Sequence, residues 1–87
     1  MYNLHSMKFG EILKCYRLQL HLKQDSMAKL LCVPLGTYKS WEYDHNFPSM
    51  ERLDKICKIL DNTFCDVSPL PSYYLHEKFV KGKLKNG

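Results

Sequence analysis

The stretch QDSMAKLLCVPLGTYKSWE, residues 24–42, decides the fold because it holds two short helical patterns on either side of a break. The first pattern predicts a helix from about Gln24 to Leu31, since its apolar residues recur at helical spacing. The sequence CVP then interrupts this pattern, and Pro34 suits the first turn of a following helix. In that second helix Tyr38 and Trp41 lie three residues apart, so we expect both side chains to face the core. The stretch therefore predicts two short helices joined by a tight turn.

Three further helices are predicted around this stretch. The first extends from about Met7 to Gln19, with Ser6 as its cap, and its apolar residues share one face. Another follows Ser49, which caps a helix that also has one apolar face. Thr63 and Asp66 form a capping box, which predicts a short fifth helix that ends before the two prolines that follow. The expected fold class is therefore all-α, with five short helices.

The composition of the chain excludes several classes of protein. Its 87 residues are expected to form one small domain, and they contain no run of about eighteen apolar residues for a membrane helix. The beginning of the chain lacks the basic and apolar regions of a signal peptide, so we expect an intracellular, cytoplasmic protein without a membrane partner. The four cysteines show no C-x-x-C pair and no common zinc spacing, and we expect them to be reduced. Neither a metal nor a cofactor is expected.

The formal net charge of +4 is unevenly distributed. Residues 1–75 hold nine Lys or Arg against eight Asp or Glu, whereas residues 76–87 hold four lysines against one acidic residue. The part that is expected to fold is thus almost neutral, and the basic character lies at the end of the chain. Charge alone therefore favours a polyanionic partner only weakly.

Two short helices with a tight turn between them form a helix-turn-helix. Across GEILKCYR…LKQDSMAKLLCVPLGTYKSWE…FPSMERLDKICKIL the chain resembles the phage-repressor (Cro/CI, or XRE) family of helix-turn-helix regulators. The order and spacing of several features carry this resemblance: Gln24 at the beginning of the motif, Ala28 at the helix crossing, Trp41-Glu42 at the end of the motif and Pro48-Ser49 before the next helix. The resemblance covers about residues 7–67 and implies a lambda-repressor-like DNA-binding domain there.

The chain departs from the family pattern where helices begin and end. The family usually has glycine after its first helix, in the central turn and after its third helix, where this chain has His21, Cys32 and Asp44. A left-handed backbone is less favourable for such residues than for glycine, by roughly 1 kcal/mol. The Ser or Thr caps of the family are replaced by Lys23 and Pro34. We expect weaker local turns and caps, with the fold itself retained.

The resemblance implies that the second helix of the motif lies in the DNA major groove. Helical spacing gives this helix an outer face, opposite Tyr38 and Trp41. Four residues of that face are the expected base contacts: Leu35, Gly36, Lys39 and Ser40. Leu35 is expected at a thymine methyl group and Gly36 at a point of close approach. The alternatives are that Gly36 is merely tolerated in a first turn and that Leu35 packs against a partner chain.

Phosphate contacts are expected to position the domain without reading sequence. The expected residues are Gln24, Thr37, Tyr43, His45 and Asn46. Gln24 is implied by the resemblance, because its amide and the beginning of its helix can face a phosphate. For each of these residues the alternative is a solvated position without a DNA contact. Glu42 is expected to hold a structural hydrogen bond or ion pair, since its charge repels phosphate.

Three segments flank the expected domain. We expect residues 1–6 to be an N-terminal arm, residues 68–80 a C-terminal extension and residues 81–87 a basic, disordered tail. The extension contains SYYLHEKFV, which fits either a short helix or a strand. Its apolar residues are the expected dimer contacts: Tyr73, Tyr74, Leu75, Phe79 and Val80. The alternative is that the extension packs back over helices of its own chain.

The function that these features favour is a sequence-specific regulator that binds double-stranded DNA, and most simply a homodimeric repressor on a palindromic operator. An alternative is an antitoxin-type adaptor, which would also bind a toxin or another small protein through the extension. An enzyme is the weakest hypothesis, because the histidines and acids form no nucleophile–base arrangement and the domain is too small for a deep pocket. RNA binding is disfavoured because the aromatic motifs of the usual RNA-binding modules are missing.

Overall fold

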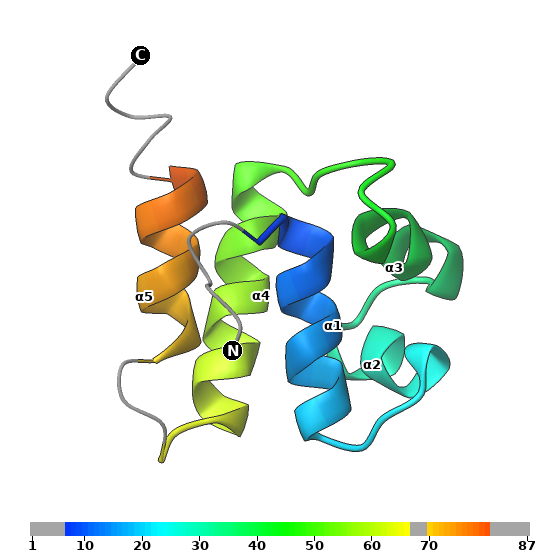
Figure 1. Cartoon of the computed structure of the whole chain (residues 1–87), viewed down its shortest axis with the longest axis horizontal. Coiled ribbons are helices and arrows are strands. Elements are labelled where there is room, and N and C mark those ends of the chain that lie inside the picture. Colours follow the sequence, from blue (N-terminus) through cyan, green and yellow to red (C-terminus); the bar gives the residue numbers. More distant parts are fainter. Residues whose placement is uncertain (1–6, 67–69, 81–87) are drawn as a thin grey trace. The chain divides into compact units, whose positions relative to one another are not determined.

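A computed structural model describes residues 7–66 and 70–80 of the chain (Figure 1). These residues form, in order, α1 (Phe9–Gln19), α2 (Gln24–Leu30), α3 (Leu35–Glu42), α4 (Met50–Thr63), α5 (Pro71–Leu75) and the π-helix η2 (His76–Val80). They contain no strand, which confirms the expected all-α class with five helices. None of the helices in this part of the chain is long and apolar enough to cross a membrane. The chain divides after Pro48 into two compact units.

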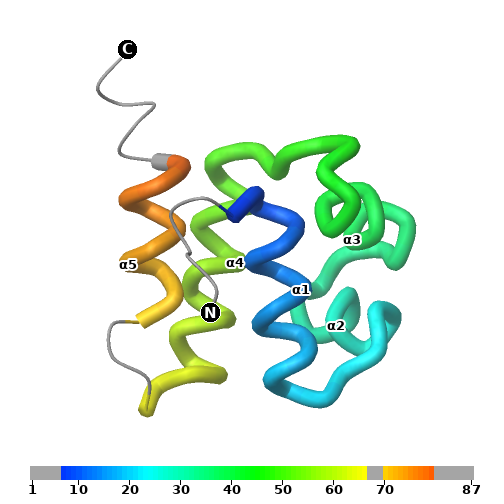
Figure 2. Tube along the Cα trace, viewed as in Figure 1, coloured from blue at the N-terminus to red at the C-terminus, as the bar shows by residue number. Residues whose placement is uncertain are grey.

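The first unit contains α1, α2 and α3, and α3 packs against both other helices. Figure 2 follows the chain through the short connection from α1 to α2 and the tight turn from α2 to α3. Tyr38 and Trp41 are only 0% and 4% exposed, which confirms that this side of α3 faces inward. Buried aromatic side chains contribute much of the apolar area that holds such a small unit together. The other buried apolar residues are Met7, Phe9, Ile12, Leu13, Tyr16, Met27, Ala28, Leu31 and Val33.

All three helices of the first unit end in the same backbone motif. His21, Cys32 and Asp44 have left-handed φ angles of 58°, 61° and 59°. At each helix end, the N–H of this residue donates to the carbonyl three residues earlier, and the N–H of the next residue donates to the carbonyl five residues earlier. This is the Schellman motif, in which the left-handed position usually holds glycine. The three departures from the family pattern thus fall on unfavourable backbone positions, while the fold is retained.

The first turn of α1 passes very close to the end of α3. A Cβ on Gly10 would lie 2.1 Å from the carbonyl oxygen of Glu42 and 2.7 Å from that of Trp41, so only glycine fits there. The N–H of Gly10 donates to Oδ1 of Asp44 at 3.0 Å. Asp44 therefore satisfies a free N–H of the first turn of α1 from a distant part of the chain. The helix begins at Phe9, later than expected, and the expected cap Ser6 lies outside the described residues.

The second unit contains α4 and α5, which run side by side in opposite directions (Figure 1). Ser49 caps α4 as expected, because its Oγ accepts the N–H of Arg52 at 3.2 Å. The N–H of Ser72, in the first turn of α5, donates to Oδ1 of Asp61 on α4 at 2.9 Å. The buried apolar side chains of this unit are Leu53, Ile56, Cys57, Leu60, Phe64, Pro71 and Leu75.

The predicted position of the fifth helix is wrong. Thr63 does not open a new helix but is the last residue of α4, and its hydroxyl donates to the carbonyl of Ile59 at 2.8 Å. Thr63 thus belongs to the last turn of α4, where a threonine hydroxyl can bond back to the preceding turn, and it does not occupy an N-cap. The fifth helix instead begins at Pro71, which was expected to end one, because proline also suits the first turn. Of the two alternatives for SYYLHEKFV, the helix is therefore correct.

Candidate nucleic-acid interface

The outer face of α3 is open to solvent. Pro34 occupies the N-cap of α3 and not its first turn, with φ −62° and ψ 150°. Beyond it, Leu35 is 38% exposed, Gly36 and Lys39 are exposed, and Ser40 is half-buried. The structure thus gathers the four expected base contacts on one accessible side of α3, opposite the buried aromatic pair.

Gly36 leaves the backbone of α3 uncovered. A Cβ placed on it would meet nothing within 4 Å, in contrast to Gly10. Packing within the chain therefore does not require glycine at position 36. An accessible backbone near the beginning of a helix allows another molecule to approach more closely than a side chain would permit.

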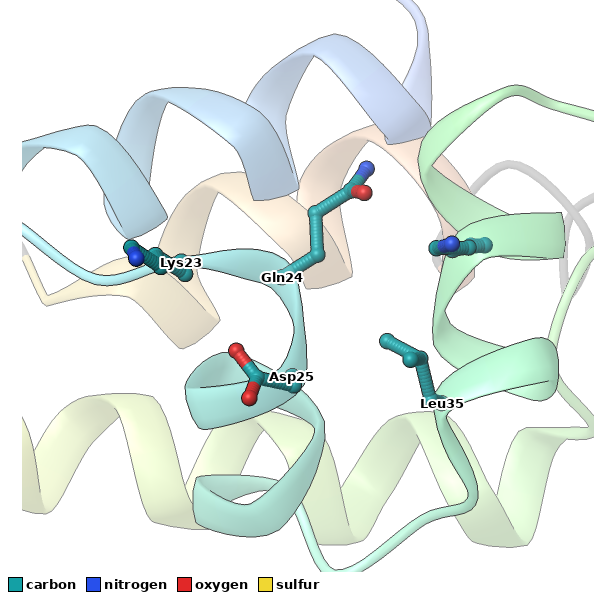
Figure 3. Close-up of a pocket in the computed structure, with 5 residues that line it drawn as sticks. Lys23, Gln24, Asp25 and Leu35 are labelled. Atoms are coloured by element: carbon teal, nitrogen blue, oxygen red, sulfur yellow. The ribbon is translucent and has the colours of Figure 1, made fainter.

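A shallow groove adjoins the outer face of α3 and separates it from the beginning of α2 (Figure 3). Gln24 extends from α2 into the open space, and Leu35 extends into it from α3 (Figure 3). The groove is lined by Lys23, Gln24, Asp25, Leu35 and Lys39. Two lysines against one aspartate give it a positive balance, and a lining of one predominant sign concentrates ligands of the opposite charge.

Behind this groove, the carboxylate of Glu42 accepts hydrogen bonds from three side chains. Arg17 binds it in bidentate fashion, with Nε 2.9 Å from Oε2 and Nη2 3.0 Å from Oε1. Nε2 of Gln24 donates to Oε1 at 3.0 Å, and the hydroxyl of Tyr38 donates to Oε2. The Glu42 side chain is only 3% exposed. This cluster ties the end of α3 to α1 and α2, which fixes the direction in which the outer face points.

The charge of Glu42 is retained despite its burial. Burial by itself would raise the pKa of this carboxyl, but the hydrogen bonds from Arg17, Tyr38 and Gln24 hold the pKa below its usual value. Burial also raises the pKa of the Tyr38 hydroxyl, and the adjacent Glu42 raises it further. Tyr38 is therefore a neutral donor, and the expected structural role of Glu42 is confirmed.

The sequence model of the helix-turn-helix family matches residues 13–67, which is more than half of the chain. This range contains the two helices and the turn described above, together with α4. The chain belongs to the XRE, or Cro/CI-like, helix-turn-helix family. It is therefore a DNA-binding regulator of transcription, from a family of DNA-binding domains and not of enzymes. Comparison with curated proteins and with solved structures finds no match.

The residues that were expected to contact phosphate lie in or beside the helix-turn-helix. Gln24 is the first residue of α2, Thr37 lies in the first turn of α3, and the other three follow the end of α3. Tyr43 is 57% exposed, and its hydroxyl accepts the second N–H of the Gln24 amide at 3.1 Å. The ring of His45 lies beside that of Tyr43, with centroids 6.2 Å apart. Nδ2 of Asn46 donates to Oγ of Ser40 at 2.6 Å. Thr37 is half-buried on α3.

The extension offers a smaller apolar surface than expected. Tyr73 is 56% exposed, Tyr74 and Phe79 are half-buried, and the two tyrosine rings meet edge to face at 5.8 Å. Leu75, however, is fully buried in its own chain, so it is not available to a second molecule. The side chain of Val80 lies outside the described part of the structure. The three remaining expected residues and the exposed Leu70, which was not among the expected contacts, are called the C-terminal apolar surface: Leu70, Tyr73, Tyr74 and Phe79.

In the described parts of the chain, no group of three or more His, Cys, Asp or Glu side chains could hold a metal ion. The four cysteines form no disulfide. Burial raises the pKa of the Cys57 thiol to about 12, with a further contribution from nearby Asp61 and Asp54. Cys57 therefore remains a protonated, unreactive thiol at neutral pH.

Sequence reasoning did not find Gly10 or Arg17. Arg17 is one of only two arginines in the chain, and arginine suits a bidentate carboxylate contact better than lysine does. The rarity of arginine could therefore have pointed to Arg17, although it does not identify Glu42 as the partner. For Gly10 the only signal was a weak helix former inside the first predicted helix.

Proposed function

We propose that the protein is a repressor that binds as a homodimer to a palindromic operator, with the outer face of α3 in the major groove. The observation that supports this most strongly is the exposure of that face beside a groove with two lysines, while the opposite face is buried. Helix-turn-helix proteins place this helix in the major groove, with its first residues at the base edges. Occupation of an operator that overlaps a promoter would then exclude the polymerase.

The side chains on the outer face favour particular base edges. The Oγ of Ser40 already accepts the amide N–H of Asn46, so its own proton is left to donate. A donor at this position suits an acceptor in the major groove, such as guanine O6 or N7 or thymine O4. Leu35 offers no hydrogen bond and suits a thymine methyl group, while Lys39 suits guanine or a phosphate. We therefore expect the side chains of this face to contact guanine and thymine edges at a few positions of each half-site.

A dimer would supply the contacts that one small domain lacks. Only eight residues form α3, and its outer face offers few groups that read bases. Two copies related by a two-fold axis double these contacts and require a palindromic site. We assign the dimer contact to the C-terminal apolar surface, because aromatic side chains such as the exposed Tyr73 are enriched at protein interfaces.

Selection of duplexes from a random DNA pool tests the proposal. A palindromic consensus with specific bases at a few positions in each half-site, together with the mass of a dimer in light scattering, is the expected result. No enrichment of any sequence would contradict sequence-specific binding. A single, non-palindromic half-site bound by a monomer would contradict the homodimer. That result would favour the antitoxin-type adaptor, in which another small protein covers the C-terminal apolar surface.

A further inference from the structure

Gln24 does not present its amide N–H groups to the groove. Its Nε2 has two protons, and it donates to Oε1 of Glu42 at 3.0 Å and to the hydroxyl of Tyr43 at 3.1 Å. Both donors of the amide are therefore used within the protein. The group that remains is the carbonyl oxygen, which only accepts hydrogen bonds.

The orientation of this amide is determined by chemistry. The Glu42 carboxylate is ionised and accepts hydrogen bonds only, so the amide must turn its NH₂ group toward it. A phosphate also only accepts hydrogen bonds. The carbonyl oxygen of Gln24 would therefore repel a phosphate, and the side chain cannot hold one without giving up its contacts with Glu42 and Tyr43.

The hydroxyl group of Tyr43, in contrast to the amide of Gln24, still has a proton that it can donate. Because its hydroxyl oxygen accepts the Gln24 N–H, its own proton is free to donate away from Gln24. The side chain is more than half exposed, and the His45 ring lies beside it. An exposed tyrosine that is held by an amide and a neighbouring ring loses less side-chain entropy when it binds than a mobile one does.

We propose that Gln24 is a positioning residue and that Tyr43, held by Gln24, donates its hydroxyl proton to a DNA phosphate. This replaces the direct phosphate contact expected of Gln24 from the family resemblance. The inference rests on the proposed function, because it concerns the same DNA interface. It places the beginning of α2 in the interface as a support for the end of α3.

The test uses the full chain and the selected operator duplex, in which one phosphate at a time is replaced by methylphosphonate. This neutral group removes one phosphate oxygen and its charge at a known position. The affinity of each modified duplex relative to the unmodified one gives the pattern of phosphates that the protein uses. The pattern is recorded for the parent protein and for Tyr43→Phe and Gln24→Met. Gln19→Met, which makes the same change at an exposed glutamine of α1, is the control.

The following results are expected. Replacing one particular phosphate in each half-site lowers the affinity of the parent protein about tenfold or more, because hydrogen bonds to charged groups are strong. For Tyr43→Phe, replacing that phosphate no longer lowers the affinity. For Gln24→Met, the same replacement lowers the affinity much less than it does for the parent. Gln19→Met keeps the pattern of the parent. In the doubly substituted protein the two losses are not additive, since Gln24 acts through Tyr43.

Other results would overturn the inference. If Gln24→Met removes sensitivity at a phosphate that Tyr43→Phe leaves unaffected, Gln24 contacts a phosphate itself. If the operator is bound but neither variant changes the pattern, neither residue is a phosphate contact, and the inference fails while the proposed function stands. If the parent binds no duplex, the proposed function fails instead. Should Gln24→Met not fold, Gln24→Asn shortens the reach to Tyr43 and is compared in the same way.

Discussion

The carbonyl oxygen of Glu42 lies only 2.1 Å from the point where a side chain on Gly10 would begin. This close passage lets the N–H of Gly10 reach the carboxylate of Asp44 at 3.0 Å. The first turn of α1 and the end of α3 are therefore held together by backbone fit and by a hydrogen bond. The direction of the outer face of α3 depends on this junction, although no residue in it faces the groove.

Two alanine substitutions are expected to have opposite effects on stability. Gly10→Ala should lower the free energy of unfolding by about 3 kcal/mol or more, because the new methyl group overlaps backbone atoms that cannot turn away. Gly36→Ala should raise it by about 0.5–1 kcal/mol, because alanine is the better helix former and the site is open. Urea unfolding of both variants measures these changes. Similar midpoints for the two variants would contradict the description of the α1–α3 junction.

Arg17→Met is expected to destabilise the protein by about 3–5 kcal/mol, since it leaves the buried carboxylate of Glu42 without its cation. Replacing both partners with apolar residues should cost less than this single change. Unfolding curves of Arg17→Met and of the double variant Arg17→Met/Glu42→Leu compare the two. A double variant less stable than Arg17→Met would contradict this expectation and would indicate that Glu42 stabilises the protein without Arg17, through the hydrogen bonds that it accepts from Gln24 and Tyr38.

The stability of the protein is expected to fall in acid because of Glu42. Its pKa in the folded protein lies below the usual 4.5, so its contribution to stability is complete above pH 4.5 and declines as the pH falls toward the lower value. Urea unfolding at a series of pH values measures this decline. Glu42→Gln should show a smaller decline over the acid range, although it is less stable at neutral pH. An equally steep decline in Glu42→Gln would place the acid sensitivity in other carboxyl groups.

The three left-handed residues are expected to respond differently to glycine. His21→Gly and Cys32→Gly should each stabilise the protein by about 1 kcal/mol, because glycine adopts positive φ without strain. Asp44→Gly should give little gain or a loss, since it also removes the acceptor for Gly10. Thermal melting distinguishes the three variants. An equal gain at all three positions would mean that the Asp44 hydrogen bond contributes nothing.

Local patterns predicted most of the fold. The spacing of Tyr38 and Trp41 was enough to identify the buried side of α3, because helix faces follow from neighbouring residues alone. The fifth helix was misplaced because Thr63 can either cap a new helix or bond back to its own, and the sequence does not decide between these. The importance of Gly10 was missed because its neighbours at residues 41 and 42 are distant in the sequence.

For the candidate site, the sequence likewise predicted the position of the residues but not all of their contacts. The outer face of α3 follows from its helical pattern, and the structure brings its four expected residues together on an accessible surface. The orientation of Gln24 could not be predicted, because it is set by Glu42 and Tyr43 at the other end of the motif. A family resemblance gives the position of such a residue but not the partners that its side chain selects in this chain.

The central claim is that the outer face of α3 reads DNA sequence, and a repeated selection with Ser40→Ala tests it most directly. This substitution removes a half-buried hydroxyl and its exposed hydrogen bond with Asn46, so it should change thermal stability only slightly. The expected result is a consensus that matches that of the parent except at one position in each half-site, where the preference of about 1–3 kcal/mol is lost. A consensus and an affinity identical to those of the parent would contradict the claim, as would a uniform loss of affinity for all sequences.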